Sequence, residues 1–187
     1  MGKHPEYPST LAKILECNEN EVKRKVLDLG YSDQRLLDRC AEMTGLSFDK
    51  YLKEEKPYMT TEEIKSLERQ GFRFGAHSTD HPLYSKLTIQ EQIEKTKSSI
   101  ELMSSILEHD TKAFSFPFTD AEVSRDFFAK CGAEITFGTA GIKHDSIATN
   151  YQRIPMEEGE MSCKSILASE YAYFAFKALL NKNYIQR

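Results

Sequence analysis

The sequence predicts an α/β fold with a parallel sheet, preceded by a helical N-terminal segment. After Pro57, strand-like runs alternate with amphipathic helices, which is the order typical of parallel sheets. Residues 1–56 instead place apolar residues at helical spacings and contain no strand-like run. The 187 residues suffice for one structural domain with a buried core. We therefore expect a helical segment or insertion at 1–56 and an α/β part at 57–187.

Residues 1–56 are predicted to form short helices joined by turns. Turn-forming residues gather at Asn18–Asn20 and at Gly30–Ser32, and they separate three apolar groups. The groups are Leu11, Ile14 and Leu15, then Val22, Val26 and Leu27, then Leu36, Leu37 and Ala41.

Four helices are predicted in the second part of the chain. Thr60 with Glu63, and Thr88 with Glu91, have the spacing of capping boxes that begin helices. The first of these helices ends at Gly71, and the second is long, with an apolar seam that reaches Leu107. The other two helices span about Val123–Cys131 and the segment after Ser162, whose Ile166, Tyr173, Phe174 and Leu180 should face the body.

Strands are predicted between these helices. Short runs rich in aromatic and β-branched residues, bounded by glycine or proline, indicate them. They are Phe72–Ala76, Ala113–Phe116, Glu134–Gly138 and Gln152–Pro155.

Composition excludes several function classes. With 25 Lys and Arg against 29 Asp and Glu, the net charge of −4 provides no basic surplus for nucleic acid or an anionic membrane. No apolar run approaches 18 residues and no signal peptide is present, so we expect a soluble, cytoplasmic protein. The four cysteines form no C-x-x-C pair, which favours reduced thiols.

The stretch G-A-H-S-T-D-H-P at residues 75–82 contains His77 and His81 directly after a predicted strand. Pro82 disfavours helical backbone before it, so the pair lies at a strand end, where parallel α/β folds place active-site loops. Two neutral imidazoles suit zinc or a similar divalent ion and need a third ligand, usually a carboxylate. The pattern indicates a metal site, with surface or packing histidines as the alternative.

These residues resemble the second motif, H-[ST]-x-x-H-P, of the NodB-homology polysaccharide deacetylases, or carbohydrate esterase family four. Phe114–Phe118 resembles the third motif, a strand that ends in a Pro-aromatic pair, and Gln152–Pro155 is similar to a late Arg-x-Pro segment. The resemblance covers about residues 57–187.

The resemblance implies a distorted or incomplete (β/α) barrel and a hydrolase of carbon–nitrogen bonds that removes N-acetyl groups from a saccharide. One divalent metal is implied, zinc first, with cobalt, nickel or manganese as alternatives, held by His77 and His81. Ser78 would fix an imidazole or the loop through its hydroxyl, and the substrate groove would be lined by Ser78, Pro117, Phe118 and Arg153.

Two motifs of the family are absent from this sequence. We find neither the early T-F-D-D-G motif, which supplies the base and the third metal ligand, nor the late L-x-x-H motif of the general acid. We expect either a truncated chain, which is favoured and whose exposed sheet edges would promote self-association, or a homologue that has lost catalysis. Asp80 and Asp120 are candidate replacement carboxylates, but capping a turn and capping a helix are their simpler roles.

The rival interpretation is a non-catalytic homologue with a structural role or one that binds a saccharide. Binding would use aromatic side chains such as Tyr84, Phe116 and Phe118. Because Phe114 and Phe116 alternate on a predicted strand, core packing is their expected role. The apolar terminal helix could bury against a partner, but burial against its own domain is expected.

Overall fold

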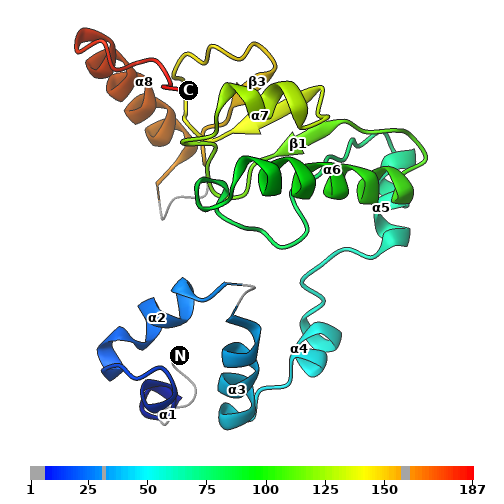
Figure 1. Cartoon of the computed structure of the whole chain (residues 1–187), viewed down its shortest axis with the longest axis vertical. Helices are drawn as coiled ribbons and strands as arrows, with labels where there is room; N and C mark the ends of the chain where they lie inside the picture. The colour runs from blue at the N-terminus through cyan, green and yellow to red at the C-terminus, as the bar shows by residue number, and fades with distance from the viewer. Residues whose placement is uncertain (1–6, 31–32, 157–160) are drawn as a thin grey trace. The chain divides into compact units, whose positions relative to one another are not determined.

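The computed structural model describes residues 7–30, 33–156 and 161–187 (Figure 1). Two compact units divide the chain, residues 1–60 and residues 61–187. In the described residues, none of the helices combines the length and the apolar character needed to span a membrane.

The first unit is helical, as the apolar spacings predict. Its helices are α1 (Tyr7–Ile14), η1 (Glu19–Glu21), α2 (Val22–Asp28), α3 (Gln34–Thr44) and α4 (Phe48–Glu55). The predicted turn at Asn18 is present, and the Glu21 carboxylate accepts a hydrogen bond from the Asn18 N–H at 3.2 Å. Gly45 caps the carboxyl end of helix α3, and its φ of 67° is the left-handed conformation that commonly closes a helix. The other predicted turn includes Tyr31 and Ser32, which lie outside the described residues.

A small apolar core holds this unit together. Ala12, Leu15, Val22 and Cys40 are buried in it, and partly buried side chains such as Ile14, Val26 and Leu36 pack around them. One member of the predicted apolar groups behaves differently, since Leu27 is 73% exposed.

The second unit alternates helices and strands, which confirms the predicted α/β class. Its elements are α5 (Thr61–Arg69), η3 (Tyr84–Lys86), α6 (Ile89–Ile106), β1 (Ala113–Ser115), α7 (Arg125–Lys130), β2 (Ile135–Gly138), β3 (Asn150–Gln152) and α8 (Cys163–Leu179). The last strand begins two residues before the predicted Gln152–Pro155, because Asn150 pairs with Thr136, whereas Pro155 has no N–H to donate.

The sheet is open and parallel, in the order β1-β2-β3. The prediction of a full strand at Phe72–Ala76 is wrong, because only Ala76 pairs with β1. Its N–H donates to the Ala113 carbonyl at 2.8 Å, and its carbonyl accepts from the Ser115 N–H at 2.9 Å. The described residues therefore show a three-stranded sheet with one bridged neighbour. The barrel and self-association through sheet edges stay predictions.

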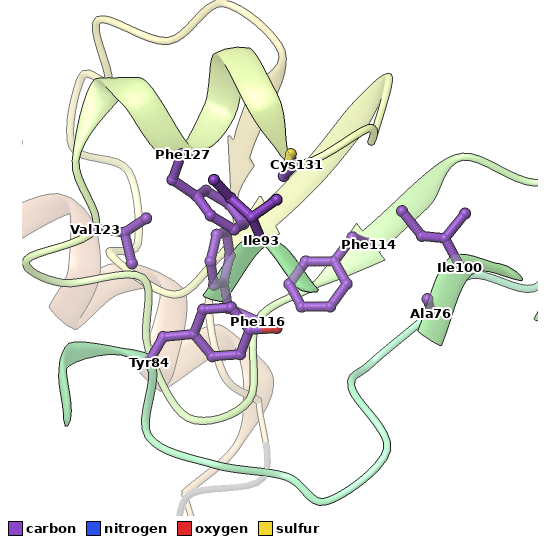
Figure 2. Close-up of a cluster of buried hydrophobic side chains, with 9 residues drawn as sticks. All are labelled: Ala76, Tyr84, Ile93, Ile100, Phe114, Phe116, Val123, Phe127 and Cys131. Carbon is purple, nitrogen blue, oxygen red and sulfur yellow. The ribbon is translucent and has the colours of Figure 1, made fainter. Parts of the chain in front are cut away.

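Aromatic side chains build the core of this unit (Figure 2). The cluster contains Ala76, Tyr84, Ile93, Ile100, Phe114, Phe116, Val123, Phe127 and Cys131. Phe114 and Phe116 are fully buried and meet edge to face, with ring centroids 5.2 Å apart, which confirms their predicted role. Each such aromatic pair contributes about 0.5–1.5 kcal/mol beyond area burial. Burial also raises the pKa of Tyr84 to about 12, so this phenol stays neutral.

Helix α6 begins at the predicted capping box. The Thr88 hydroxyl accepts from the Glu91 N–H at 3.3 Å, and the Glu91 carboxylate accepts from the Thr88 N–H at 2.8 Å. Replacing Thr88 by alanine should lower the free energy of unfolding by about 1 kcal/mol, because a backbone donor loses its partner. Urea unfolding measures this difference. Gln90→Ala, in the same first turn, should have a much smaller effect, and equal effects would contradict the capping role.

Helix α8 departs from the prediction that it buries against its own domain. Its cap is as predicted, since the Ser162 hydroxyl accepts from the Ser165 N–H at 3.2 Å, and Ile166 is buried. Tyr173 and Leu180, predicted to face the body, are each 49% exposed. Apolar residues occur on every side of this helix, so its sequence does not define a single buried face.

Candidate functional site

The two predicted metal ligands lie side by side at the carboxyl end of β1. His77 follows Ala76, the residue bridged to β1, and its Nδ1 lies 2.8 Å from the carbonyl oxygen of Ser115, the last residue of that strand. The Nε2 atoms of His77 and His81 are 3.1 Å apart. The sheet edge therefore orients the first imidazole, and the loop brings the second one to it.

The contact with Ser115 fixes the tautomer of His77. A backbone carbonyl only accepts hydrogen bonds, so the proton of the neutral His77 ring is on Nδ1 and the lone pair is on Nε2. Burial, and then the neighbouring His77, lower the pKa of His81 below its usual value, which favours a neutral ring at His81. The neutral ring is the form in which imidazole binds metals.

The backbone around the pair lies in an uncommon conformation. Ser78, His81 and Phe118 have φ values of 66°, 49° and 57°. These values lie in the left-handed region, which is unfavourable for most residues other than glycine. Asp80 holds this loop, since it accepts from the Ser78 hydroxyl at 3.2 Å and pairs with Lys95 of α6 at 2.6 Å. Such backbone persists where surrounding contacts enforce it, and this pattern is typical of functional sites.

The pair fits two ligands of a divalent ion. Two nitrogens about 2.0–2.1 Å from a tetrahedral zinc lie roughly 3.3 Å apart, close to the 3.1 Å between the two Nε2 atoms. The Nδ1 contact of His77 with a backbone carbonyl is the outer-shell interaction that metal-binding histidines commonly make. Within residues 7–30, 33–156 and 161–187, no three His, Cys, Asp or Glu side chains come together in a way that could hold an ion.

The two candidate replacement carboxylates are engaged elsewhere. Asp80 pairs with Lys95, as described above. Asp120 does not cap α7 as expected, because that helix begins at Arg125 with Ser124 as its N-cap. The side chain of Asp120 is instead 2% exposed and pairs with Arg187, the last residue of the chain.

Asp120 belongs to a buried polar network that the sequence did not predict. Its carboxylate accepts from Asn150 Nδ2 and Gln152 Nε2, each at 2.8 Å, and from the Thr139 N–H at 3.2 Å. Arg187 Nη2 bridges Asp120 and Asp145. No local sequence signal could have identified this network, since Arg187 lies 67 residues from Asp120 along the chain.

Because of this network, the free energy of unfolding should depend on pH in the acid range. Burial alone would raise the pKa of Asp120 and of Asp145. Hydrogen bonds from Gln152, Arg187 and Asn150 outweigh burial at Asp120, and those from Arg187, the Ile147 N–H and Asn150 outweigh it at Asp145, so both pKa values lie below the usual range. Groups with a lowered pKa in the folded state stabilise it fully above their unfolded pKa of about 3.9, and this stabilisation is lost as the pH falls.

Between pH 5 and pH 3, we expect protonation of the two carboxylates of the network to lower the free energy of unfolding by roughly 1–3 kcal/mol. Urea unfolding at both pH values measures the change. The Asp145→Asn variant, which lacks one of the two titrating groups, should lose less on acidification than the wild type. An equal loss in both proteins would contradict a titrating role for Asp145.

A groove of about 610 Å³ runs along the sheet beside the pair. It is lined by residues 73–77, by β1, by Ile135 and Phe137 of β2, and by Arg153. Arg153 is fixed there, because its Nε donates to the Gly138 carbonyl at 3.1 Å and its Nη2 to the Phe116 carbonyl at 3.2 Å. His77 and Arg153, two of the predicted site residues, therefore share one groove.

The other predicted groove residues lie elsewhere. Pro117 is fully buried and does not line this groove as predicted. The chain turns directly after it, at Phe118, whose φ is 57°. Phe118 is 63% exposed and packs edge to face on His81, with ring centroids 4.6 Å apart. Ser78 contacts Asp80 within the histidine loop. Phe118 thus lies at the histidine pair and not on the sheet.

The aromatic side chains of the rival binding hypothesis are mostly inaccessible. Tyr84 and Phe116 are fully buried in the core, and only Phe118 of the three is exposed. A saccharide could therefore stack on Phe118 but not on the other two.

The family comparison agrees with the fold and the paired histidines. A family model described as polysaccharide deacetylase matches residues 40–134, just over half of the chain, and this span contains the histidine loop and β1. The chain therefore belongs to the polysaccharide deacetylase family, which confirms the resemblance seen in its sequence.

Among solved structures, the chain is similar to the Streptococcus pyogenes deacetylase PplD in complex with acetate. The two share 14% sequence identity with a TM-score of 0.48, and the match covers 87% of this chain and 86% of the other. No curated protein matches this chain.

Proposed function

We propose that the chain is a metal-dependent hydrolase that removes N-acetyl groups from a saccharide. Membership of the polysaccharide deacetylase family supports the reaction class and the saccharide substrate. The observation that carries the metal dependence is the His77–His81 pair, with Nε2 atoms 3.1 Å apart and one ring oriented by a backbone carbonyl. Zinc is the proposed ion, with cobalt, nickel and manganese as alternatives.

The chain's own residues supply orientation at this site. His77 and His81 would hold the ion, which when bound would provide Lewis-acid polarisation of the acetyl carbonyl and activation of water. Ser115 keeps the lone pair of His77 on Nε2. Arg153, fixed by two strand-end carbonyls, presents its guanidinium along the groove, where N–H donors suit the hydroxyl groups of a sugar.

The distorted (β/α) barrel is part of the same proposal. The strands are parallel in the order β1-β2-β3, with α7 between β1 and β2 and α6 between the bridged Ala76 and β1, and such strand–helix units are the parts of which this barrel is built. The family supports this architecture, and the histidine loop would then lie at the carboxyl face, where barrel enzymes place their active sites.

A second candidate function is a non-catalytic homologue that binds metal or saccharide without hydrolysis. One observation favours it: the described residues bring no carboxylate to the histidine pair. A metal held by only two protein ligands would lack the third ligand usual in catalytic zinc sites.

Acetate release tests the proposal. The protein is treated with chelator and then restored with zinc or cobalt before incubation with an N-acetylated oligosaccharide. We expect acetate only after a metal is restored. The matched control is the His77→Ala variant, which should release none under any condition. Metal binding without acetate release would instead support the non-catalytic homologue.

A further inference from the structure

We propose that Arg187 is a positioning residue for the histidine pair. Arg187 would position the pair by anchoring the loop at residues 118–123, because Phe118 of this loop packs against His81. The inference rests on the proposed function of the pair as metal ligands. Among the described residues, the Arg187 side chain bonds to Asp120, Val123 and Asp145 and to neither histidine, so its effect on the site would pass through the loop.

The anchor itself is buried and fully engaged. The Arg187 side chain is 1% exposed, and its guanidinium lies over the Phe128 ring at 4.7 Å. Its Nη1 donates to the Asp120 carbonyl at 2.7 Å, while Nη2 pairs with the carboxylates of Asp120 and Asp145. Arg187 thus binds both the backbone and the side chain of one loop residue, which a point charge such as lysine would not reproduce.

The position of Arg187 is itself determined by the segment before it. The Ile185 N–H donates to the His144 carbonyl at 2.9 Å, and the His144 N–H donates to the Asn183 carbonyl at 2.9 Å. The His144 ring also packs against Tyr184, with centroids 5.1 Å apart. The end of the chain is therefore held against the α/β unit, and Arg187 enters the network from a fixed backbone.

From Asp120 the contacts continue to the pair. Asp120 Oδ1 accepts from the Thr139 N–H at 3.2 Å, and the Thr139 hydroxyl donates to the Phe118 carbonyl at 3.0 Å. The Phe118 ring then meets the His81 ring at 4.6 Å and 74°. Each step is a direct contact, so a displaced Asp120 would release the backbone that places Phe118.

The carboxylate of Asp120 is closely packed against Gly138. Gly138 lies directly beneath it, and a Cβ there would come within 2.3 Å of Asp120 Oδ2. A side chain at Gly138 would therefore force Asp120 out of the network. The Arg153 side chain donates to the carbonyls of Gly138 and Phe116, and in the part of the chain that the structure describes it makes no hydrogen bond to the loop at 118–123, so Arg187 has a separate role.

The experiment compares His81 in four metal-free variants by NMR and measures their zinc affinity by competition. Arg187→Gln removes the anchor, and Thr139→Val removes one link while leaving the core unchanged. Phe118→Leu removes the ring that shifts the His81 imidazole protons. Glu68→Gln is the control: it alters a buried carboxylate of the same unit that binds the N–H groups of Glu108 and His109, away from the loop.

We expect Arg187→Gln and Thr139→Val to move the His81 ring protons in the direction seen for Phe118→Leu. Zinc affinity should fall about 10-fold or more in Arg187→Gln, as for other losses around metal ligands. Glu68→Gln should leave both quantities at wild-type values. The inference is overturned if Arg187→Gln shifts the His81 ring-proton resonances no more than Glu68→Gln does. If Arg187→Gln does not fold, Thr139→Val is judged by the same criterion. A wild type that binds no zinc would refute the proposed function alone, because the His81 shift still decides this inference.

Discussion

The Asp120→Ala variant is expected to be about 3–5 kcal/mol less stable than the wild type. The substitution leaves the guanidinium of Arg187, 1% exposed, with only one of its two carboxylate partners in the interior. It also removes the acceptor for Asn150, Gln152 and the Thr139 N–H. Breaking a buried ion pair by removing one partner is costly because the remaining charge stays desolvated. Urea unfolding at neutral pH measures the difference.

The matched control for this prediction is Asp126→Ala. Asp126 pairs with Lys130 on the surface of α7, where both side chains are at least 60% exposed. Surface pairs of this kind contribute about 0–1 kcal/mol. If the two substitutions had similar effects on the free energy of unfolding, the buried network would not stabilise the α/β unit as described.

The second large effect is expected at the metal ligands. His77→Ala should weaken zinc binding by more than about 100-fold, because loss of a ligand exceeds the 10–100-fold effect of losing an outer-shell partner. A competition titration with a chromogenic chelator measures the affinity. His81→Ala should behave in the same way, since the two Nε2 atoms lie 3.1 Å apart and would share one ion.

His109→Gln is the control for the ligand variants. His109 is 67% exposed on its side chain and contacts Glu68, far in sequence from the pair, and glutamine can donate the same hydrogen bond. Its zinc affinity should equal that of the wild type. Zinc binding that survived in both His77→Ala and His81→Ala would show that another part of the chain binds the ion.

Local sequence signals predicted the helices well and the strands less well. Capping at Thr88 and Ser162 depends on residues three positions apart, so the sequence alone identifies the starts of α6 and α8. Pairing of Phe72–Ala76 depends on a distant partner strand, and in the structure only Ala76 finds one. The orientation of α8 could not be predicted, because apolar residues on all its sides give no periodic signal.

The site shows the same division between local and distant information. His77 and His81 are four residues apart, so a single loop can bring them together and the sequence could predict the pair. The place of Phe118 against His81 depends on a turn whose left-handed φ was not foreseeable from residue type. Arg187 and Asp145 meet Asp120 only through the tertiary fold, and polar residues far apart in sequence carry no shared pattern.

The most direct test of the central proposal is anomalous X-ray diffraction from zinc-soaked crystals, recorded on both sides of the zinc absorption edge. We predict one strong anomalous peak within about 2.0–2.1 Å of Nε2 of both His77 and His81. The peak should disappear in crystals of His77→Ala. A peak at any other group of side chains, or none at the pair under saturating zinc, would contradict the assignment of these histidines as metal ligands.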